Sequence, residues 1–217
     1  MNKEHQLTFL ETLFTPLVSD AMDRLGIEGF VLPPSIQSIS KDPNLRIAGY
    51  AFPCRVIPTD EYVEISKLLE MVDSIPRDSI VLVASDKDTD AALWGGLMSA
   101  GAKTRGARGA VVNGGVRDIA QIDSLDFPVF AQYKCIKDIR KRGYMAEYGV
   151  PISMFGIQIK PNDIIFGDAN GVVVIPSECS ESLFAELQKS LLGEQKTEAG
   201  LLAGLNAQDL FREHGTF

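Results

Sequence analysis

Histidine and cysteine are scarce in this sequence of 217 residues. The two histidines, His5 and His214, lie near the ends of the chain, and the three cysteines are widely spaced without a CxxC pair. A histidine triad or a His-ligated zinc needs an imidazole inside the fold, and a disulfide framework needs patterned cysteines. The sequence therefore argues against these chemistries. It favours free thiols in a reducing cytoplasm, and chemistry based on carboxylates, guanidinium groups, backbone amides and a hard metal ion.

Long apolar runs and basic runs are also absent. The longest apolar stretches, such as 80–84 and 172–175, are too short to span a bilayer, and the first residues lack the apolar segment of a signal peptide. The 29 acidic residues outnumber the 21 Lys and Arg, which gives a net charge of -8. Because an acidic surface repels phosphate backbones, we expect a cytoplasmic protein that binds neither nucleic acid nor membranes.

The composition is that of a folded protein, with 45% hydrophobic and 23% charged residues. Apolar residues recur at three- and four-residue steps near both ends, which predicts helices within 1–30 and within 177–217. Between them, short apolar segments typical of strands alternate with helical spacing. The predicted strands are 46–57, 79–84, 110–112, 128–131, 157–159, 163–166 and 171–175, and the predicted helices are 62–72, about 95–103 and a short one from about 118. This alternation predicts one α/β domain over 1–217 with a mixed sheet.

Three local features can also be predicted. Thr15 followed by Pro16 is typical of an N-cap and a first helical position. The strand at 46–57 is expected to bulge near Pro53, because proline cannot donate to a sheet ladder. The strand at 110–112 is expected to end in a turn at Asn113-Gly114-Gly115.

The first candidate site is a glycine-rich segment that follows a predicted strand. It nearly mimics a phosphate-binding loop, but Ala102 stands where that motif needs lysine, so we reject a nucleotide site. Glycines at a helix start let the backbone approach a ligand, and the first N–H groups point outward. Gly95, Gly96, Leu97 and Met98 are therefore candidates to bind a small carboxylate. Alternatively, the glycines only relieve crowding at a strand-to-helix corner.

The second candidate site is the pair Arg117 and Asp118, which follows the next glycine-rich segment. A guanidinium matches a carboxylate in a two-bond fork. A carboxylate beside it can bind Mg²⁺ or Mn²⁺ together with water and substrate oxygens. In the alternative interpretation, Asp118 interacts with a helix dipole and Arg117 is solvated.

The segment 94–118, WGGLMSAGAKTRGARGAVVNGGVRD, resembles the signature of the RraA-like family. That family includes 4-hydroxy-4-methyl-2-oxoglutarate aldolase and the regulator of ribonuclease activity A. The aldolases of that family share a motif in which a glycine or aspartate is followed, after twenty intervening residues, by Arg-Asp. This chain is similar, because Gly96 and Arg117 stand at that separation and Asp118 follows. Further similarity lies at 18–21 and 167–176.

The resemblance implies a layered β/β/α swivelling-type domain that assembles as a homotrimer or a pair of trimers, with sites at subunit boundaries. It implies that Gly95–Met98 contact a pyruvate-like substrate through the backbone, that Arg117 holds it, and that Asp118 ligates a divalent metal ion, Mg²⁺ or Mn²⁺. The implied activity is metal-dependent cleavage of 2-oxo acids like 4-hydroxy-4-methyl-2-oxoglutarate to pyruvate, with decarboxylation of oxaloacetate. The alternative is a non-catalytic, protein-binding regulator of a ribonuclease.

Three further positions bear on this resemblance. Many active relatives carry Glu or Asp three residues after the metal-binding aspartate, whereas this chain has Gln121, whose amide cannot act as a base. Lys103 is the one lysine close in sequence to the site, but its place late in a helix argues against Schiff-base chemistry. Four C-terminal acids are either contributed to a neighbouring chain's site or form a solvated helix face: Glu194, Glu198, Asp209 and Glu213.

Overall fold

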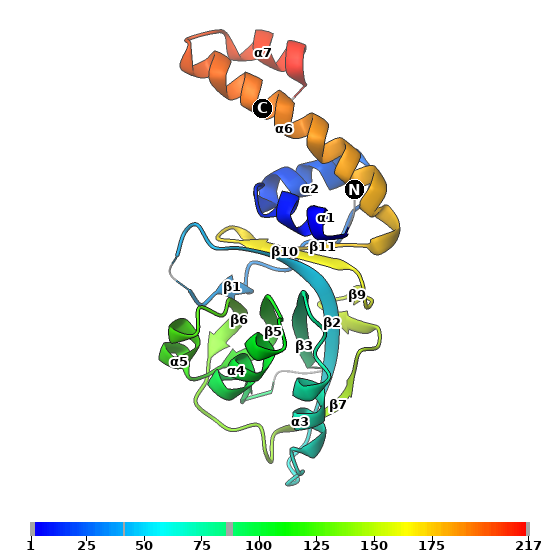
Figure 1. Ribbon diagram of the computed structural model, residues 1–217, viewed down its shortest axis with the longest axis vertical. Coiled ribbons are helices and arrows are strands. Elements are labelled where there is room, and N and C mark those ends of the chain that lie inside the picture. Colours follow the sequence, from blue (N-terminus) through cyan, green and yellow to red (C-terminus); the bar gives the residue numbers. More distant parts are fainter. Residues whose placement is uncertain (1–2, 41, 86–88, 216–217) are drawn as a thin grey trace. The chain divides into compact units, whose positions relative to one another are not determined.

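The computed structural model in Figure 1 describes residues 3–40, 42–85 and 89–215. The chain forms two compact units, one from Gly29–Ser177 and one that combines Met1–Glu28 with Glu178–Phe217. Within the described ranges, no helix has the length and apolar character needed to cross a bilayer.

The larger unit is built on a nine-stranded mixed sheet. Its centre holds four parallel strands in the order β6 (Val129–Lys134), β5 (Gly109–Val116), β3 (Ser79–Ser85) and β2 (Arg46–Pro58). The short β4 (Ala92–Trp94) also runs parallel to β5. Antiparallel strands complete the sheet: β1 (Gln37–Ser38) beside β6, β7 (Gly143–Tyr148) and β10 (Ile164–Asp168) beside β2, and β11 (Gly171–Ile175) beside β10.

The sheet has a different cover on each face (Figure 1). On one face, α3 (Ser66–Asp73), α4 (Gly96–Thr104) and α5 (Ile119–Ser124) pack over a core that includes Val81 and Val83 of β3. On the other face, the two-stranded sheet of β8 (Ile152–Met154) and β9 (Ile157–Ile159) packs over Ile80 and Leu82. Successive side chains of β3 point to opposite faces of the sheet. Because both faces are covered, the strand is a continuous apolar run. These layers confirm the predicted α/β fold.

The smaller unit is helical, as its apolar spacing predicts. It contains α1 (Lys3–Leu10), α2 (Thr15–Arg24), α6 (Ser180–Leu202) and α7 (Ala207–His214), and the 3-10 turn η1 (Ser177–Cys179) precedes α6. The guanidinium of Arg24 joins α2 to α6, with Nε 3.1 Å from Glu186 Oε1 and Nη2 2.7 Å from Ser190 Oγ. That all 217 residues behave as one domain stays a prediction.

One local prediction is wrong, and a second is right in place but not in cause. Thr15 is the first residue of α2 and not its N-cap, because the extended residue is Phe14, which makes no side-chain capping hydrogen bond. β2 has an irregularity between Arg55 and Val56 in the pairing with β7, close to Pro53 as expected, but Pro53 itself sits inside regular parallel pairing with β3. The carbonyl of Pro53 instead accepts a hydrogen bond from the Gly149 N–H at 2.8 Å.

The predicted turn at Asn113-Gly114-Gly115 is also wrong, because β5 continues through these residues to Val116. The glycines serve close packing inside the strand. A Cβ on Gly114 would lie 2.7 Å from Leu93 Cδ1, and one on Gly115 would lie 2.6 Å from the Ala91 carbonyl oxygen. Because Gly114 and Gly115 have no side chains, β4 can lie against β5. The candidate residues that follow these two strands are neighbours as a result.

Candidate functional site

The two candidate segments are neighbours because β4 and β5 are parallel. Trp94 pairs with Val116, and the backbone N–H of Arg117 donates to the Trp94 carbonyl at 3.1 Å. Gly95 and Arg117 are the residues that follow these paired positions. Ligands of α/β sheets commonly bind at the carboxyl ends of parallel strands.

Asp118 links the starts of two helices. It has a left-handed backbone (φ 60°, ψ 39°) and precedes α5, but its side chain makes no capping hydrogen bond to that helix. Instead, its Oδ2 accepts a hydrogen bond from the Gly96 N–H at 3.1 Å, at the start of α4. Aspartate tolerates this backbone region better than most residues, and such conformations cluster at functional sites. The carboxylate is therefore directed toward the glycine segment.

Arg117 lies between two carboxylates. Its Nε is 3.6 Å from Asp118 Oδ2, and its Nη1 donates to Asp138 Oδ2 at 3.3 Å. Asp138 in turn accepts from the Nε and Nη2 of Arg140 at 2.9 and 3.3 Å. We call Arg117, Asp118, Asp138 and Arg140 the charged cluster. Its two cations and two carboxylates balance one another.

The Arg140 side chain sets the ionisation of Asp138. Its hydrogen bond is the largest of the effects that lower the pKa of Asp138 to about 2, and the Arg140 backbone N–H and the Arg117 side chain act in the same direction. The same hydrogen bond raises the pKa of Arg140. Asp138 is therefore a carboxylate at neutral pH, and it binds Nη1 of Arg117 while Asp118 lies near Nε.

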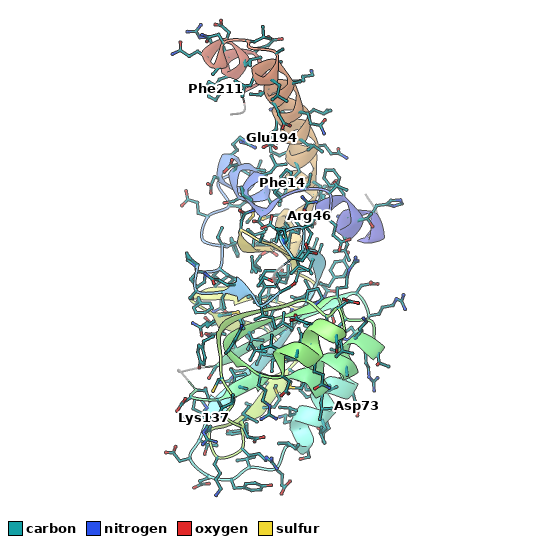
Figure 2. The ribbon with its side chains drawn as sticks, turned by 90° about the vertical axis from the view of Figure 1, so that its left-hand side faces the viewer. Phe14, Arg46, Asp73, Lys137, Glu194 and Phe211 are labelled. Carbon is teal, nitrogen blue, oxygen red and sulfur yellow. The ribbon has the colours of Figure 1, made fainter. Side chains whose placement is uncertain are left out.

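The charged cluster lines a cavity of about 330 Å³, in the lower part of the range for small-molecule sites. Apolar side chains make the rest of the lining, from the start and face of α3, from β4, from α4 and from the segment after β6: Ile65, Leu68, Leu69, Val72, Ala92, Leu93, Trp94, Leu97, Met98 and Ile139. Figure 2 labels Asp73 at the end of α3 and Lys137 in the segment after β6, and both lie at the same end of the larger unit, away from Arg46 at the start of β2. The cavity lining therefore combines the charged cluster with apolar side chains.

Trp94 and Ser99 anchor the start of α4. The buried indole of Trp94 stacks on Phe127 at 6.3 Å, and its Nε1 donates to Ser99 Oγ at 2.8 Å. The same hydroxyl lies 3.1 Å from the Gly95 carbonyl, to which it donates. Of the four predicted backbone donors, Gly96 is engaged by Asp118, while Leu97 and Met98 belong to the first helical turn, whose N–H groups have no intrahelical acceptor.

Comparison with known proteins places the chain in a family. The model of the RraA-like family, described as Aldolase/RraA, matches residues 15–174. The chain belongs to the RraA-like family. It is 32% identical to a Halalkalibacterium halodurans protein named "Putative 4-hydroxy-4-methyl-2-oxoglutarate aldolase", covering 90% of this chain and 88% of that one.

Two further comparisons bear on the length and the fold of the chain. The chain is 31% identical to protein DlpA of Legionella pneumophila over 86% of its own length, but spans only 30% of that protein. The crystal structure of an uncharacterized protein from Pseudomonas syringae pv. tomato superposes with a TM-score of 0.86 at 25% identity, covering 98% of this chain and 95% of that one. The two structures therefore share one fold over nearly all of this chain.

Gln121 has a packing role in the candidate site. A Cβ on Gly96 would lie 2.1 Å from Gln121 Oε1, so the amide occupies the space that any side chain at 96 would need. Glycine at 96 and glutamine at 121 are therefore coupled by shape. Lys103 is directed elsewhere, since its Nζ donates to the Leu125 carbonyl and its side chain does not line the cavity.

The residues present fit a hard divalent cation bound by one carboxylate. Among the residues that the structure describes, no group of three His, Cys, Asp or Glu side chains could hold a metal ion. Asp118 is half exposed and lines the cavity, and the hydrogen bond from the Gly96 N–H goes to its Oδ2. Mg²⁺ and Mn²⁺ accept such a single carboxylate, with water and substrate oxygens completing the coordination.

Asp138 and Arg140 are site residues that the sequence analysis missed. They follow β6, which is parallel to β5, and Val116 pairs with Lys134. Residues just beyond this strand therefore reach the same sheet edge as Arg117. The alternating charges of the segment Lys137-Asp138-Ile139-Arg140 were the available signal.

The four C-terminal acids are all exposed residues of the smaller unit. Glu194, labelled in Figure 2, and Glu198 line a separate groove with Phe14 and Leu201, and Asp209 accepts from Arg212 at 3.1 Å. Glu213 is likewise exposed near the end of α7. A contribution of these acids to a neighbouring chain's site stays a prediction.

Proposed function

We propose that this protein is a divalent-metal-dependent carbon–carbon lyase that releases pyruvate from small 2-oxo acids such as 4-hydroxy-4-methyl-2-oxoglutarate, and that it also decarboxylates oxaloacetate. One observation carries the proposal: Arg117, Asp118 and the first turn of α4 meet at one cavity of about 330 Å³. The name of the relative from H. halodurans supports the same class of reaction.

In this proposal Arg117 and the α4 backbone bind the substrate anion. A guanidinium has five N–H donors, and only its Nη1 is used in a hydrogen bond to Asp138. The donors that face neither Asp138 nor Asp118 would bind a carboxylate or the 2-oxo oxygen of the substrate. The N–H groups of Leu97 and Met98 add partial positive charge from the helix start.

Asp118 would hold the divalent cation, Mg²⁺ or Mn²⁺, within reach of the same anion. When bound, the cation supplies positive charge beside the oxygen on which negative charge develops. The role of the Gly96 N–H is to keep the Asp118 carboxylate in place, because that hydrogen bond forms before substrate arrives.

The reaction breaks the C3–C4 bond of a 4-hydroxy-2-oxo acid. The 4-hydroxyl loses its proton to water, C4 becomes a carbonyl carbon, and the electron pair of the broken bond forms the enolate of pyruvate. Protonation at C3 then gives pyruvate. In oxaloacetate the departing group is CO₂ and the enolate is the same, so stabilisation of that enolate by Arg117 accelerates both reactions.

The test is a lactate dehydrogenase-coupled assay of pyruvate release from 4-hydroxy-4-methyl-2-oxoglutarate and from oxaloacetate, with Mn²⁺ and with a chelator. We expect chelation or Asp118→Asn to abolish turnover. Arg117→Ala should reduce kcat/KM about a hundredfold or more, because a lost two-bond fork costs about 3 kcal/mol. The control is Asp123→Asn, an exposed acid of α5 outside the cavity lining, which should keep full activity.

Full activity in chelator would disprove the role of a metal ion, and a loss of less than tenfold in Arg117→Ala would disprove substrate binding by that residue. Absence of pyruvate from every 2-oxo acid would favour the regulatory alternative. In that case the acidic chain should retain a basic protein partner in a pull-down. The amount of partner retained should fall steeply as the salt concentration rises.

A further inference from the structure

Arg140 lines the cavity, but the reaction proposed above gives it no part. Its side chain bonds to Asp138 through Nε at 2.9 Å and through Nη2 at 3.3 Å, and the Tyr62 hydroxyl also hydrogen-bonds to it. A guanidinium has five N–H donors, so these contacts leave Arg140 with donors for a ligand. The cavity therefore offers a second cation in addition to Arg117.

One carboxylate oxygen sets the distance between the two guanidinium groups. Asp138 Oδ2 lies 3.3 Å from Nη1 of Arg117 and 3.3 Å from Nη2 of Arg140. These two nitrogens are therefore at most twice that distance apart. The two carboxyl carbons of an extended five-carbon diacid are about 5 Å apart, as C–C bond lengths and angles require. The spacing of the guanidinium groups thus suits the two ends of such a diacid.

The charged cluster also matches a doubly negative substrate once a cation is bound at Asp118. Arg117, Asp138 and Arg140 together carry one positive charge, because the two guanidinium groups share one carboxylate. In the proposed function, the charge of a divalent cation exceeds that of Asp118 by one. The site then presents two positive charges, which a 2-oxo diacid balances. Burial of a second carboxylate is strongly unfavourable without such a partner.

We propose that Arg140 binds the distal carboxylate of the substrate while Arg117 binds the 2-oxo acid end, so that Arg140 determines the preference of the site for diacids. The inference rests on the proposed function and adds the residue that recognises the C5 carboxylate of 4-hydroxy-4-methyl-2-oxoglutarate. The C4–C5 bond stays intact in the cleavage, so this carboxylate leaves with the second product. Asp138 is a positioning residue, because it holds both guanidinium groups.

The experiment compares two substrates that differ only in the distal group, in the coupled assay with Mn²⁺. One is 4-hydroxy-4-methyl-2-oxoglutarate, which yields two pyruvates. The other is 4-hydroxy-4-methyl-2-oxopentanoate, in which a methyl group replaces the C5 carboxylate, and which yields pyruvate and acetone. We expect Arg140→Leu to lower kcat/KM for the glutarate about tenfold or more beyond its effect on the pentanoate, because charge-assisted hydrogen bonds are lost. Arg140→Lys keeps the charge but not the two-bond fork, so its effect should be smaller.

The matched control is Arg105→Leu. Arg105 also pairs with an aspartate, since its Nη2 lies 2.7 Å from Asp73 Oδ1, and its side chain is 44% exposed against 48% for Arg140. It lies outside the cavity lining, so the ratio of kcat/KM for the two substrates should keep its wild-type value. The ratio is the readout because Arg140 also holds Asp138, and loss of that contact should slow both substrates alike.

A binding measurement separates this inference from the proposed function. Neither 2-oxoglutarate nor 2-oxopentanoate has a 4-hydroxyl group, so neither can undergo the cleavage. Calorimetry with Mn²⁺ present should show that the wild type binds 2-oxoglutarate about tenfold more tightly than 2-oxopentanoate, and that Arg140→Leu loses this preference. If no substrate yields pyruvate but this binding pattern holds, the lyase proposal fails and the role of Arg140 stands.

Two outcomes would overturn the role of Arg140 while leaving the lyase intact. One is an equal loss of kcat/KM for both substrates in Arg140→Leu, with the binding preference for 2-oxoglutarate unchanged. The other is a change of the substrate ratio in Arg105→Leu as large as that in Arg140→Leu, which would show that any lost surface cation has this effect.

Discussion

At position 95 the absence of a side chain is a requirement of the site. Gly95 has an extended backbone (φ -165°, ψ -175°) that any residue can adopt, so its need for glycine does not arise from conformation. A Cβ there would lie 2.8 Å from Asp118 Oδ2 and 3.2 Å from Arg117 Cγ. The glycine therefore leaves room for the two side chains to which we assign the chemistry.

Gly95→Ala should displace the Asp118 carboxylate. We expect the Mn²⁺ concentration for half-maximal pyruvate release to rise at least tenfold, measured by metal titration in the coupled assay. The control is Gly96→Ala combined with Gln121→Ala, which adds a methyl group one residue away but removes the amide it would meet. An equal effect in the control would show that any added methyl group disturbs the segment, whatever Asp118 does.

A second prediction at the residue scale concerns the contribution of Asp138 to the pH dependence of the free energy of unfolding. Its pKa of about 2 lies below the ordinary value of about 3.9, so its stabilisation is fully present above pH 5 and is lost as the pH falls through about 2. Urea unfolding of wild type and Asp138→Asn should therefore differ most at pH 6 and converge toward pH 2.5. We expect a difference of about 1 kcal/mol, because solvent screens a group this exposed. A difference that does not change with pH would contradict the assignment.

At the scale of elements, the start of α4 is held in place by a buried hydrogen bond. The indole of Trp94 is 1% exposed and donates to Ser99, so the end of β4 and the first turn of α4 are tied together. This link fixes Gly95 and Gly96 between them, opposite Arg117 and Asp118. The backbone donors of the site thus depend on a side-chain contact that takes no part in the chemistry.

Ser99→Ala removes the acceptor of the Trp94 N–H. A buried donor without a partner costs about 1–3 kcal/mol, so we expect a loss of that size in the free energy of unfolding, measured in urea. Ser124→Ala is the matched control, because its exposed hydroxyl donates to the Gln121 carbonyl at 2.7 Å and its loss should change stability by less than about 0.5 kcal/mol. Equal losses in both variants would contradict the anchoring role.

At the scale of the whole molecule, several large apolar side chains stay exposed on the single chain, including Ile136 at 92%. Exposed apolar surface is typical of proteins that associate. We therefore expect sedimentation to give three or six times the chain mass of 23.7 kDa, as the family resemblance implies. A monomer at all micromolar concentrations would contradict this assembly.

Much of the fold could be predicted because helices and buried strands have local sequence patterns. The apolar run of β3 and the helical spacing of α2 and α6 are readable without knowing any partner. The short strands β1, β4, β7 and β8 were missed, since two to six residues acquire a strand conformation from the neighbours that they pair with. The glycines of β5 were misread as a turn for the same reason: their meaning lies in the packing of β4.

By itself, the sequence determined which residues are candidates for chemistry, because each segment has a local pattern: Gly95–Met98 places glycines at a predicted helix start, and Arg117-Asp118 places opposite charges after a glycine-rich segment. Only the tertiary structure decided that these segments meet, since their contact depends on the parallel pairing of β4 with β5. It also decided that Asp138 and Arg140 join them from the segment after β6 and that α3 supplies apolar side chains to the cavity. Contacts between residues far apart in the chain are settled by sheet order and helix packing, which no local pattern encodes.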